Sequence, residues 1–249
     1  MPRYRLILEY DGAGLVGWQR QNNGLSVQEI LETAVERFCG RKLTVHGAGR
    51  TDAGVHALAQ AAHVDLPKES PPDVIRNALN QHAKPHAVAV LAAQRVADNF
   101  DARRAARGRV YRYRILNRRA PSALERGRVW HVGSALDVAA MQEGAALLLG
   151  KHDFTSFRDS MCQARSPVKT LDALDVTHAG DEIVIEARAR SFLHHQVRNM
   201  VGSLKLVGAG KWRARHIAEA LDARDRRAGG PTAPAEGLYL VEVIYPEAP

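Results

Sequence analysis

The spacing of apolar residues changes repeatedly along this chain, and this change restricts the fold class. Between Arg3 and Tyr10 apolar and polar residues alternate, which predicts a strand. Between Ser26 and Gly40 the apolar residues recur every three or four positions, which predicts a helix. Ser26 and Glu29 form a capping-box pattern at its start, and Gly40 ends it. The chain is therefore expected to mix strands and helices.

The same two spacings recur in both halves of the sequence. Further strands are expected at 43–46, 59–64, 88–93, 111–115, around 174, at 183–190 and at 238–245. Further helices are expected at 72–80, at 137–149, near Phe192 and near His216. Each half then contains strands interleaved with helices, which predicts a pseudo-duplicated α+β architecture. We place the two domains at residues 1–104 and 105–249.

Composition narrows the class of protein. The 249 residues carry 35 Lys and Arg against 27 Asp and Glu, a net charge of +8, and 28 of the 35 cations are arginine. Hydrophobic residues at 45% exclude wholesale disorder. No apolar run approaches the roughly 20 residues of a membrane span, and no signal-peptide pattern opens the chain. Cys39 and Cys162 are too far apart for a zinc knuckle or redox pair, so we expect a basic cytoplasmic protein.

Several familiar ligand motifs fail on inspection. The run from Gly208 to Lys211 lacks the first glycine of a phosphate loop, and Trp212 stands where Ser or Thr is required. Gly12 and Gly14 follow a strand but lack the rest of a dinucleotide fingerprint. No metal-binding His or Cys spacing and no nucleophile elbow is present. The sequence therefore indicates no cofactor and no metal.

A segment rich in arginine marks the start of the second half. Residues 103–119 contain eight arginines and no acidic residue. A strand at 111–115 would place Tyr111, Tyr113 and Ile115 on one face and arginines on the other. Such a surface is suited to RNA phosphates, with strongly salt-dependent affinity. The alternative is a solvated strand face.

The candidate for chemistry is the glycine-flanked segment 49–56. Its glycines allow a tight turn and the approach of a ligand. Asp52 lies on that turn two residues after Arg50, and a nearby cation keeps a carboxylate ionised and available as a nucleophile or base. An ordinary solvated Asx-turn would have the same residue types.

A resemblance to a known family decides between these interpretations. Residues 48–57 (AGRTDAGVHA) resemble the catalytic motif of the tRNA pseudouridine synthase A family almost letter for letter. Companion segments resemble the family's other motifs across the whole chain: 10–12 (YDG), 17–21 (GWQRQ), 152–154 (HDF), 191–193 (SFL), 197–202 (VRNMVG) and 234–240 (PAEGLYL).

The resemblance implies a fold and an activity. The fold is α+β, with two similar domains of antiparallel sheets flanked by helices that form a basic RNA-binding cleft. The activity is the cofactor-free isomerisation of uridine to pseudouridine at positions 38, 39 and 40 in the anticodon arm of tRNA. The family also implies a homodimer.

The resemblance also assigns roles to residues of this chain. Asp52 is the catalytic carboxylate, with Arg50 beside it and Arg198 as the basic residue that pairs with it. Tyr111 is expected to contact the substrate, with Tyr113 as the alternative. Thr51 is also expected to bind the substrate. The arginines expected to bind RNA are Arg20, Arg103, Arg104, Arg107, Arg109 and Arg112.

Two other function classes compete with this interpretation. A non-catalytic RNA-binding module would use the same basic surface, but it has no use for an ionised carboxylate beside RNA phosphates. A nucleotide- or metal-dependent enzyme has no supporting motif. The sequence leaves open whether the carboxylate attacks the uracil ring, attacks C1′, or removes a proton to leave a glycal.

Overall fold

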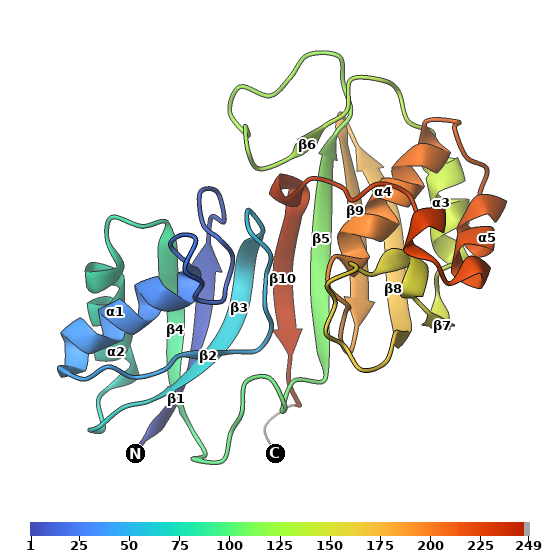
Figure 1. Ribbon diagram of the computed structural model, residues 1–249. Helices are drawn as coiled ribbons and strands as arrows, with labels where there is room; N and C mark the ends of the chain where they lie inside the picture. Colours follow the sequence, from blue (N-terminus) through green and yellow to red (C-terminus); the bar gives the residue numbers. More distant parts are fainter. Residues whose placement is uncertain (247–249) are drawn as a thin grey trace. The chain divides into compact units, whose positions relative to one another are not determined.

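The computed structural model describes residues 1–246, and its chain divides into two compact units. The first comprises residues 1–107 and the chain from Tyr239 onward, and the second comprises residues 108–238. The sequence-based boundary between residues 104 and 105 assigned the whole C-terminal part to the second domain. The last strand instead belongs to the first unit, because it pairs there with an internal strand. Figure 1 labels the elements along the chain.

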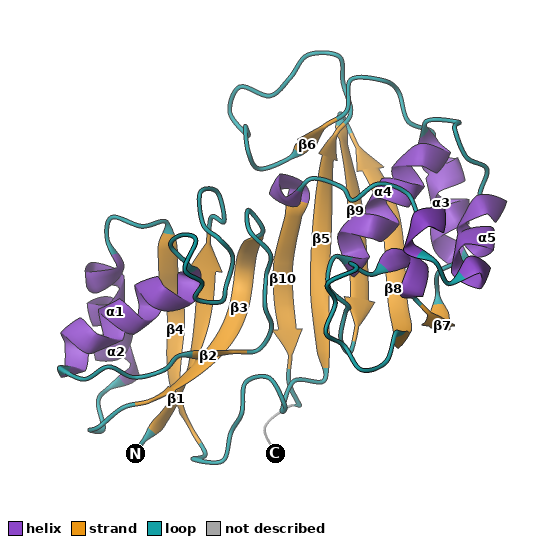
Figure 2. Cartoon of the chain, viewed as in Figure 1, coloured by secondary structure: helices purple, strands orange, loops and turns teal. Residues whose placement is uncertain are grey.

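The first unit is a sheet with helices on one face (Figures 1 and 2). Its strands and helices are β1 (Arg3–Tyr10), α1 (Val27–Cys39), β2 (His46–Gly47), β3 (His56–Asp65), α2 (Pro72–Ala83), β4 (Val88–Val96) and β10 (Leu238–Ile244). The strands run in the order β4-β1-β3-β10, with β2 on β3. β1 is antiparallel to both of its neighbours, whereas β10 is parallel to β3.

Local sequence explains most of this unit. The even-numbered side chains of β1 are buried on one face, as its alternation predicts. α1 begins where the Ser26 hydroxyl accepts a hydrogen bond from the Glu29 N–H, and it ends at Gly40 with φ 71°. β2 is shorter than the strand expected at 43–46, with only two paired residues.

The second unit has the same plan of a sheet with helices on one face (Figure 2). Its elements are β5 (Gly108–Leu116), β6 (Trp130–His131), α3 (Val138–Ala146), β7 (Gly150–Asp153), β8 (Val168–Ala179), β9 (Glu182–Ala189), α4 (Gln196–Gly208) and α5 (Arg215–Ala223). The strands run antiparallel in the order β5-β9-β8-β7, and β6 is parallel to β5. The predicted α+β fold class is thus confirmed.

α4 begins later than the sequence indicated. A helix was expected from about Phe192, but the first helical residue is Gln196. His195 has φ 60°, in the left-handed region, and a right-handed helix does not extend back through such a residue. Short 3₁₀ turns lie at Thr155–Phe157, Arg226–Ala228 and Ala235–Gly237, the last two at the ends of segment 228–237, whose glycines and prolines predict a loop. None of the helices within residues 1–246 combines the length and hydropathy that crossing a membrane requires.

Candidate active site

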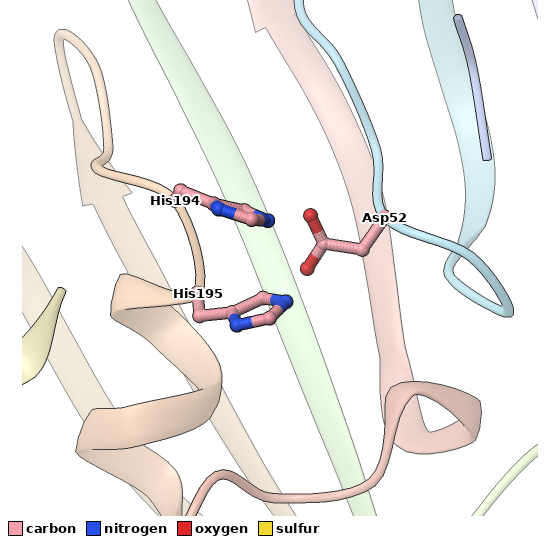
Figure 3. Close-up of side chains that lie close together, drawn as sticks. All are labelled: Asp52, His194 and His195. Atoms are coloured by element: carbon pink, nitrogen blue, oxygen red, sulfur yellow. The ribbon is translucent and has the colours of Figure 1, made fainter. Parts of the chain in front are cut away.

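In the first unit, the candidate carboxylate lies on the connection from β2 to β3. Asp52 is half-buried and projects from this loop (Figure 3), while Arg50 is exposed. Thr51 between them is only 6% exposed, and its Oγ1 lies 2.8 Å from the hydroxyl of Tyr10. The Thr51 side chain, expected to contact substrate, thus has its hydroxyl engaged inside the first unit.

The loop is held against the preceding glycine-rich segment, residues 11–25, by backbone hydrogen bonds. The Trp18 N–H donates to the Thr51 carbonyl over 3.0 Å, and the Gly54 N–H donates to the Leu15 carbonyl over 3.3 Å. A Cβ at Gly17 would lie 2.4 Å from the Thr51 oxygen. The approach of the two backbones therefore depends on a glycine outside the motif itself.

Arg20, an expected RNA contact, is tied to α1. The nearly buried carboxylate of Glu32 accepts hydrogen bonds from the Arg20 guanidinium, from Gln28 Nε2 (3.1 Å) and from the Val45 N–H (3.1 Å). The Arg20 N–H donates to Gln28 Oε1 over 3.1 Å. The Arg20 side chain nevertheless stays 59% exposed, so solvent still reaches it.

In the second unit, both candidate tyrosines lie on β5 but differ in burial. Tyr113 is fully buried, and its hydroxyl donates to the Pro234 carbonyl over 2.8 Å. Burial raises the pKa of Tyr113 well above its usual value. Tyr111 is half-buried and meets Phe192 edge to face, with ring centroids 5.2 Å apart. Of the two, only Tyr111 has a ring that solvent reaches.

Arg198, on α4, is positioned by the segment around residues 231–233, which packs against this helix. Its Nε donates to the Ala233 carbonyl over 2.8 Å, and the Ala233 N–H donates to the Arg198 carbonyl over 3.1 Å. Gly202, one turn further along α4, lets the same segment pack closely, because a Cβ there would lie 1.7 Å from the Pro231 oxygen. The guanidinium is thus fixed by backbone from a distant part of the second unit.

As neighbours on an expected helix, His194 and His195 were predicted to point in different directions as surface and packing residues, but they precede α4 and their rings lie together. His194 and His195 (Figure 3) have ring centroids 4.0 Å apart, and Asp159 lies 2.7 Å from His195 Nδ1 and 3.7 Å from His194 Nδ1. Burial acts to raise the pKa of Asp159, but the Met161 N–H and the histidines outweigh it and lower that pKa. Adjacency of the two histidines was visible in the sequence, but their acidic partner, 35 residues before His194, was not.

The remaining expected RNA contacts fall into two groups. Arg103, Arg104 and Arg107 are exposed on the loop that precedes β5. Arg112 on β5 is ion-paired with Glu186, 3.0 Å away, and Arg109 donates to the Arg190 carbonyl over 2.7 Å.

The sheet face that carries Arg112 is a mixed-charge surface. Arg114 pairs with Glu182 at 2.6 Å and with Glu125 at 2.7 Å, and its hydrogen bond lowers the pKa of Glu182. A hollow of about 330 Å³ lies on this face, and its lining residues are Arg112, Arg114, Asp175, Thr177, Glu182, Val184 and Glu186. Arg112 and Arg114 thus have acidic partners that the segment 103–119 does not itself contain.

Comparison with known proteins gives a consistent result. The family model described as tRNA pseudouridine synthase matches residues 6–103 and 145–246. Proteins named tRNA pseudouridine synthase A are 64% identical in Paramagnetospirillum magneticum and 62% identical in Rhodospirillum centenum, each over 98% of this chain and over 96% and 100% of the relative. A third, from Beijerinckia indica, is 60% identical over 99% of this chain and 95% of its own length. The chain therefore belongs to the tRNA pseudouridine synthase family.

Proposed function

We propose that this protein isomerises uridine to pseudouridine at positions 38, 39 and 40 of tRNA and that Asp52 is its catalytic carboxylate. The observation that carries the proposal is a half-buried carboxylate on a loop whose backbone is tied down on both sides of it. The full-length match to proteins named for this reaction supports it.

The reaction is an isomerisation, so its atoms balance without a cofactor. The N1–C1′ bond of uridine breaks, the uracil rotates, and C5 bonds to C1′. C5 gives up its proton, and N1 gains one. An ionised carboxylate can begin each available route, by attacking the ring, by attacking C1′, or by taking a proton to leave a glycal. The proposal assigns this first step to Asp52.

The target base must leave the helical stack before it reacts, at a cost of a few kcal/mol. We assign Tyr111 to stack on the extruded base, an interaction that contributes about 1–3 kcal/mol in single-strand binding. Its half-exposed ring, braced by Phe192, supports this assignment. We likewise assign Arg198 as the basic residue that pairs with the catalytic carboxylate.

Phosphate binding is assigned first to the exposed arginines. Arg103, Arg104 and Arg107 lie on one loop, and Arg20 keeps an open face. Arg109 and Arg112 are also proposed to bind phosphates, although Arg112 is already ion-paired with Glu186. We further propose that the enzyme acts in the cytoplasm as a homodimer, which sedimentation equilibrium of the purified chain tests.

Tritium release from tRNA that carries 5-tritiated uridine tests the reaction directly. Tritium leaves only when C5 becomes the new glycosidic carbon. We expect release by the wild type, no release by Asp52→Ala or Asp52→Asn, and unchanged tRNA affinity in both variants. Asp98→Asn, which makes the same chemical change at an exposed acid of the same unit, should retain activity.

The outcomes separate the competing functions. Release that survives in both Asp52 variants removes Asp52 from the central role. Binding of tRNA without release by the wild type supports the alternative of a non-catalytic RNA-binding module.

A further inference from the structure

Beneath the Asp52 loop lies a chain of buried polar groups that no step of the reaction uses. Tyr10, at the end of β1, is 3% exposed, and Gln60, on β3, is fully buried. The Tyr10 hydroxyl lies 2.8 Å from Thr51 Oγ1, and the Gln60 side chain is close enough to it to oppose the rise in the pKa of Tyr10. Gln60 Nε2 donates to the Gly49 carbonyl over 3.0 Å. The contacts therefore run continuously from Gly49 through Gln60 and Tyr10 to Thr51.

We propose that Tyr10 and Gln60 are positioning residues that fix the Asp52 carboxylate through Thr51 and Gly49. This inference rests on the catalytic role proposed above for Asp52. Thr51 is the immediate neighbour of Asp52, and Gly49 lies three residues before it. The two anchors thus hold the short segment that leads into the carboxylate.

The anchors are rigid because they stand on paired strands. Tyr10 pairs with Ala57 in the register of β1 and β3, and Gln60 pairs with Leu8. Gln60 is further fixed because its Oε1 accepts a hydrogen bond from the Ala61 N–H over 3.1 Å. A buried polar group that loses its partner is costly, so the loop is strongly held in the one arrangement that satisfies all of these groups.

The hydroxyl of Tyr10 can serve in this way throughout the neutral range. Burial raises the pKa of Tyr10 to about 12, an effect that its hydrogen bonds to Thr51 and Gln60 only partly oppose. The Tyr10 side chain therefore stays neutral and keeps its proton. A protonated phenol can both donate and accept a hydrogen bond, which a link between two polar side chains requires.

A purely structural role would have a different signature, and the chain contains a matched control. Tyr4 lies on β1 with its side chain on the same buried face as Tyr10, and it is 1% exposed. Its hydroxyl donates to the Ser70 carbonyl and accepts from the Ser70 N–H, both over 2.9 Å. Tyr4→Phe therefore also removes one buried hydroxyl and its hydrogen bonds, but away from the Asp52 loop.

The test compares Tyr10→Phe with Tyr4→Phe in single-turnover tritium release and in tRNA affinity. We expect Tyr10→Phe to lower the maximal rate about 10-fold or more while KM and tRNA affinity stay near wild type, since displacement of a reacting group by about 1 Å costs roughly 100-fold. Tyr4→Phe should keep the rate within about twofold, although both variants lower the unfolding midpoint.

Two variants at Thr51 confirm the path of the effect. Thr51→Ser keeps the hydroxyl and should keep most of the rate, whereas Thr51→Val should match Tyr10→Phe. The double variant Thr51→Val with Tyr10→Phe should be no slower than the slower of the two single variants, because both substitutions remove the same interaction between Tyr10 and Thr51. Gln60→Met should also lower the rate at unchanged tRNA affinity.

Three results would overturn the inference: a wild-type rate in Tyr10→Phe, equal losses in the two tyrosine variants, or an effect confined to KM. The assignment of Asp52 fails on a different result, activity in Asp52→Asn. The two failures are therefore distinguishable in one assay.

Discussion

Gly17 is a residue at which a single added methyl group should displace the Asp52 loop. It has φ +98°, and a Cβ added there would lie 2.4 Å from the Thr51 oxygen, 2.9 Å from the Asp52 carbonyl carbon and 3.1 Å from the Ala53 nitrogen. Ordinary contacts begin at 3.4 Å, so Gly17→Ala requires the Thr51 oxygen to move by about 1 Å and the other two atoms by less. All three belong to backbone, which cannot rotate away as a side chain can.

The expected magnitudes follow from that displacement. A residue with a Cβ in the left-handed region costs about 1–2 kcal/mol relative to glycine. Movement of the loop also weakens the hydrogen bond from the Trp18 N–H to Thr51, and such a bond contributes about 1 kcal/mol. We therefore expect Gly17→Ala to lose about 2–3 kcal/mol of unfolding free energy and about 100-fold in the rate of tritium release.

Gly14→Ala is the control for this experiment. Gly14 lies in the same segment with φ +74°, but nothing is within 4 Å of an added Cβ. It should lose about 1–2 kcal/mol in urea unfolding while the single-turnover rate stays near wild type. If Gly17→Ala keeps its rate, or if Gly14→Ala loses as much, the argument from backbone approach is refuted.

Three further predictions concern charge, pH and packing. Arg104→Ala should reduce the salt slope of tRNA affinity by about one, whereas Arg112→Ala should change it less because Glu186 already pairs with that guanidinium; equal slopes would contradict this. Burial raises the pKa of Tyr10 to about 12 in the folded chain, whereas the unfolded chain loses this proton near pH 10, so the unfolding free energy falls as pH rises between these values. Urea unfolding at several pH values should show a smaller fall in Tyr10→Phe than in the wild type. Gly202→Ala, with its Cβ 1.7 Å from the Pro231 oxygen, should lower unfolding free energy by about 1–3 kcal/mol, and an unchanged urea midpoint would refute it.

The elements that the sequence predicts well are those with local causes. The strand at Arg3–Tyr10 has the predicted bounds because its alternation is complete within eight residues. The helix after Ser26 has the predicted caps because a side-chain oxygen and a glycine determine both ends locally. The late start of α4 was not predictable in the same way, because residues other than glycine seldom adopt the left-handed φ that His195 has.

What the sequence could not supply is the partner of each element. The closing strand was expected at 238–245, yet nothing in its own residues indicates that it pairs with β3 of the first unit. The same holds for the candidate site. The motif identifies Asp52, but its supports at Tyr10, Gly17 and Gln60 lie outside the ten-residue match, and only folding brings them under the loop.

The arginine-rich strand shows how register changes an electrostatic interpretation. A count along residues 103–119 finds eight cations and no acid, which indicates an uncompensated basic surface. The register of β5 with β9 places Glu186 directly opposite Arg112, and Glu182 reaches Arg114 from the neighbouring strand end. Cross-strand pairs of opposite charge stabilise the sheet and reduce the field available to a phosphate. We therefore expect the loop before β5 to contribute more to binding of RNA phosphates than the β5 face does, because Arg103, Arg104 and Arg107 are exposed on this loop.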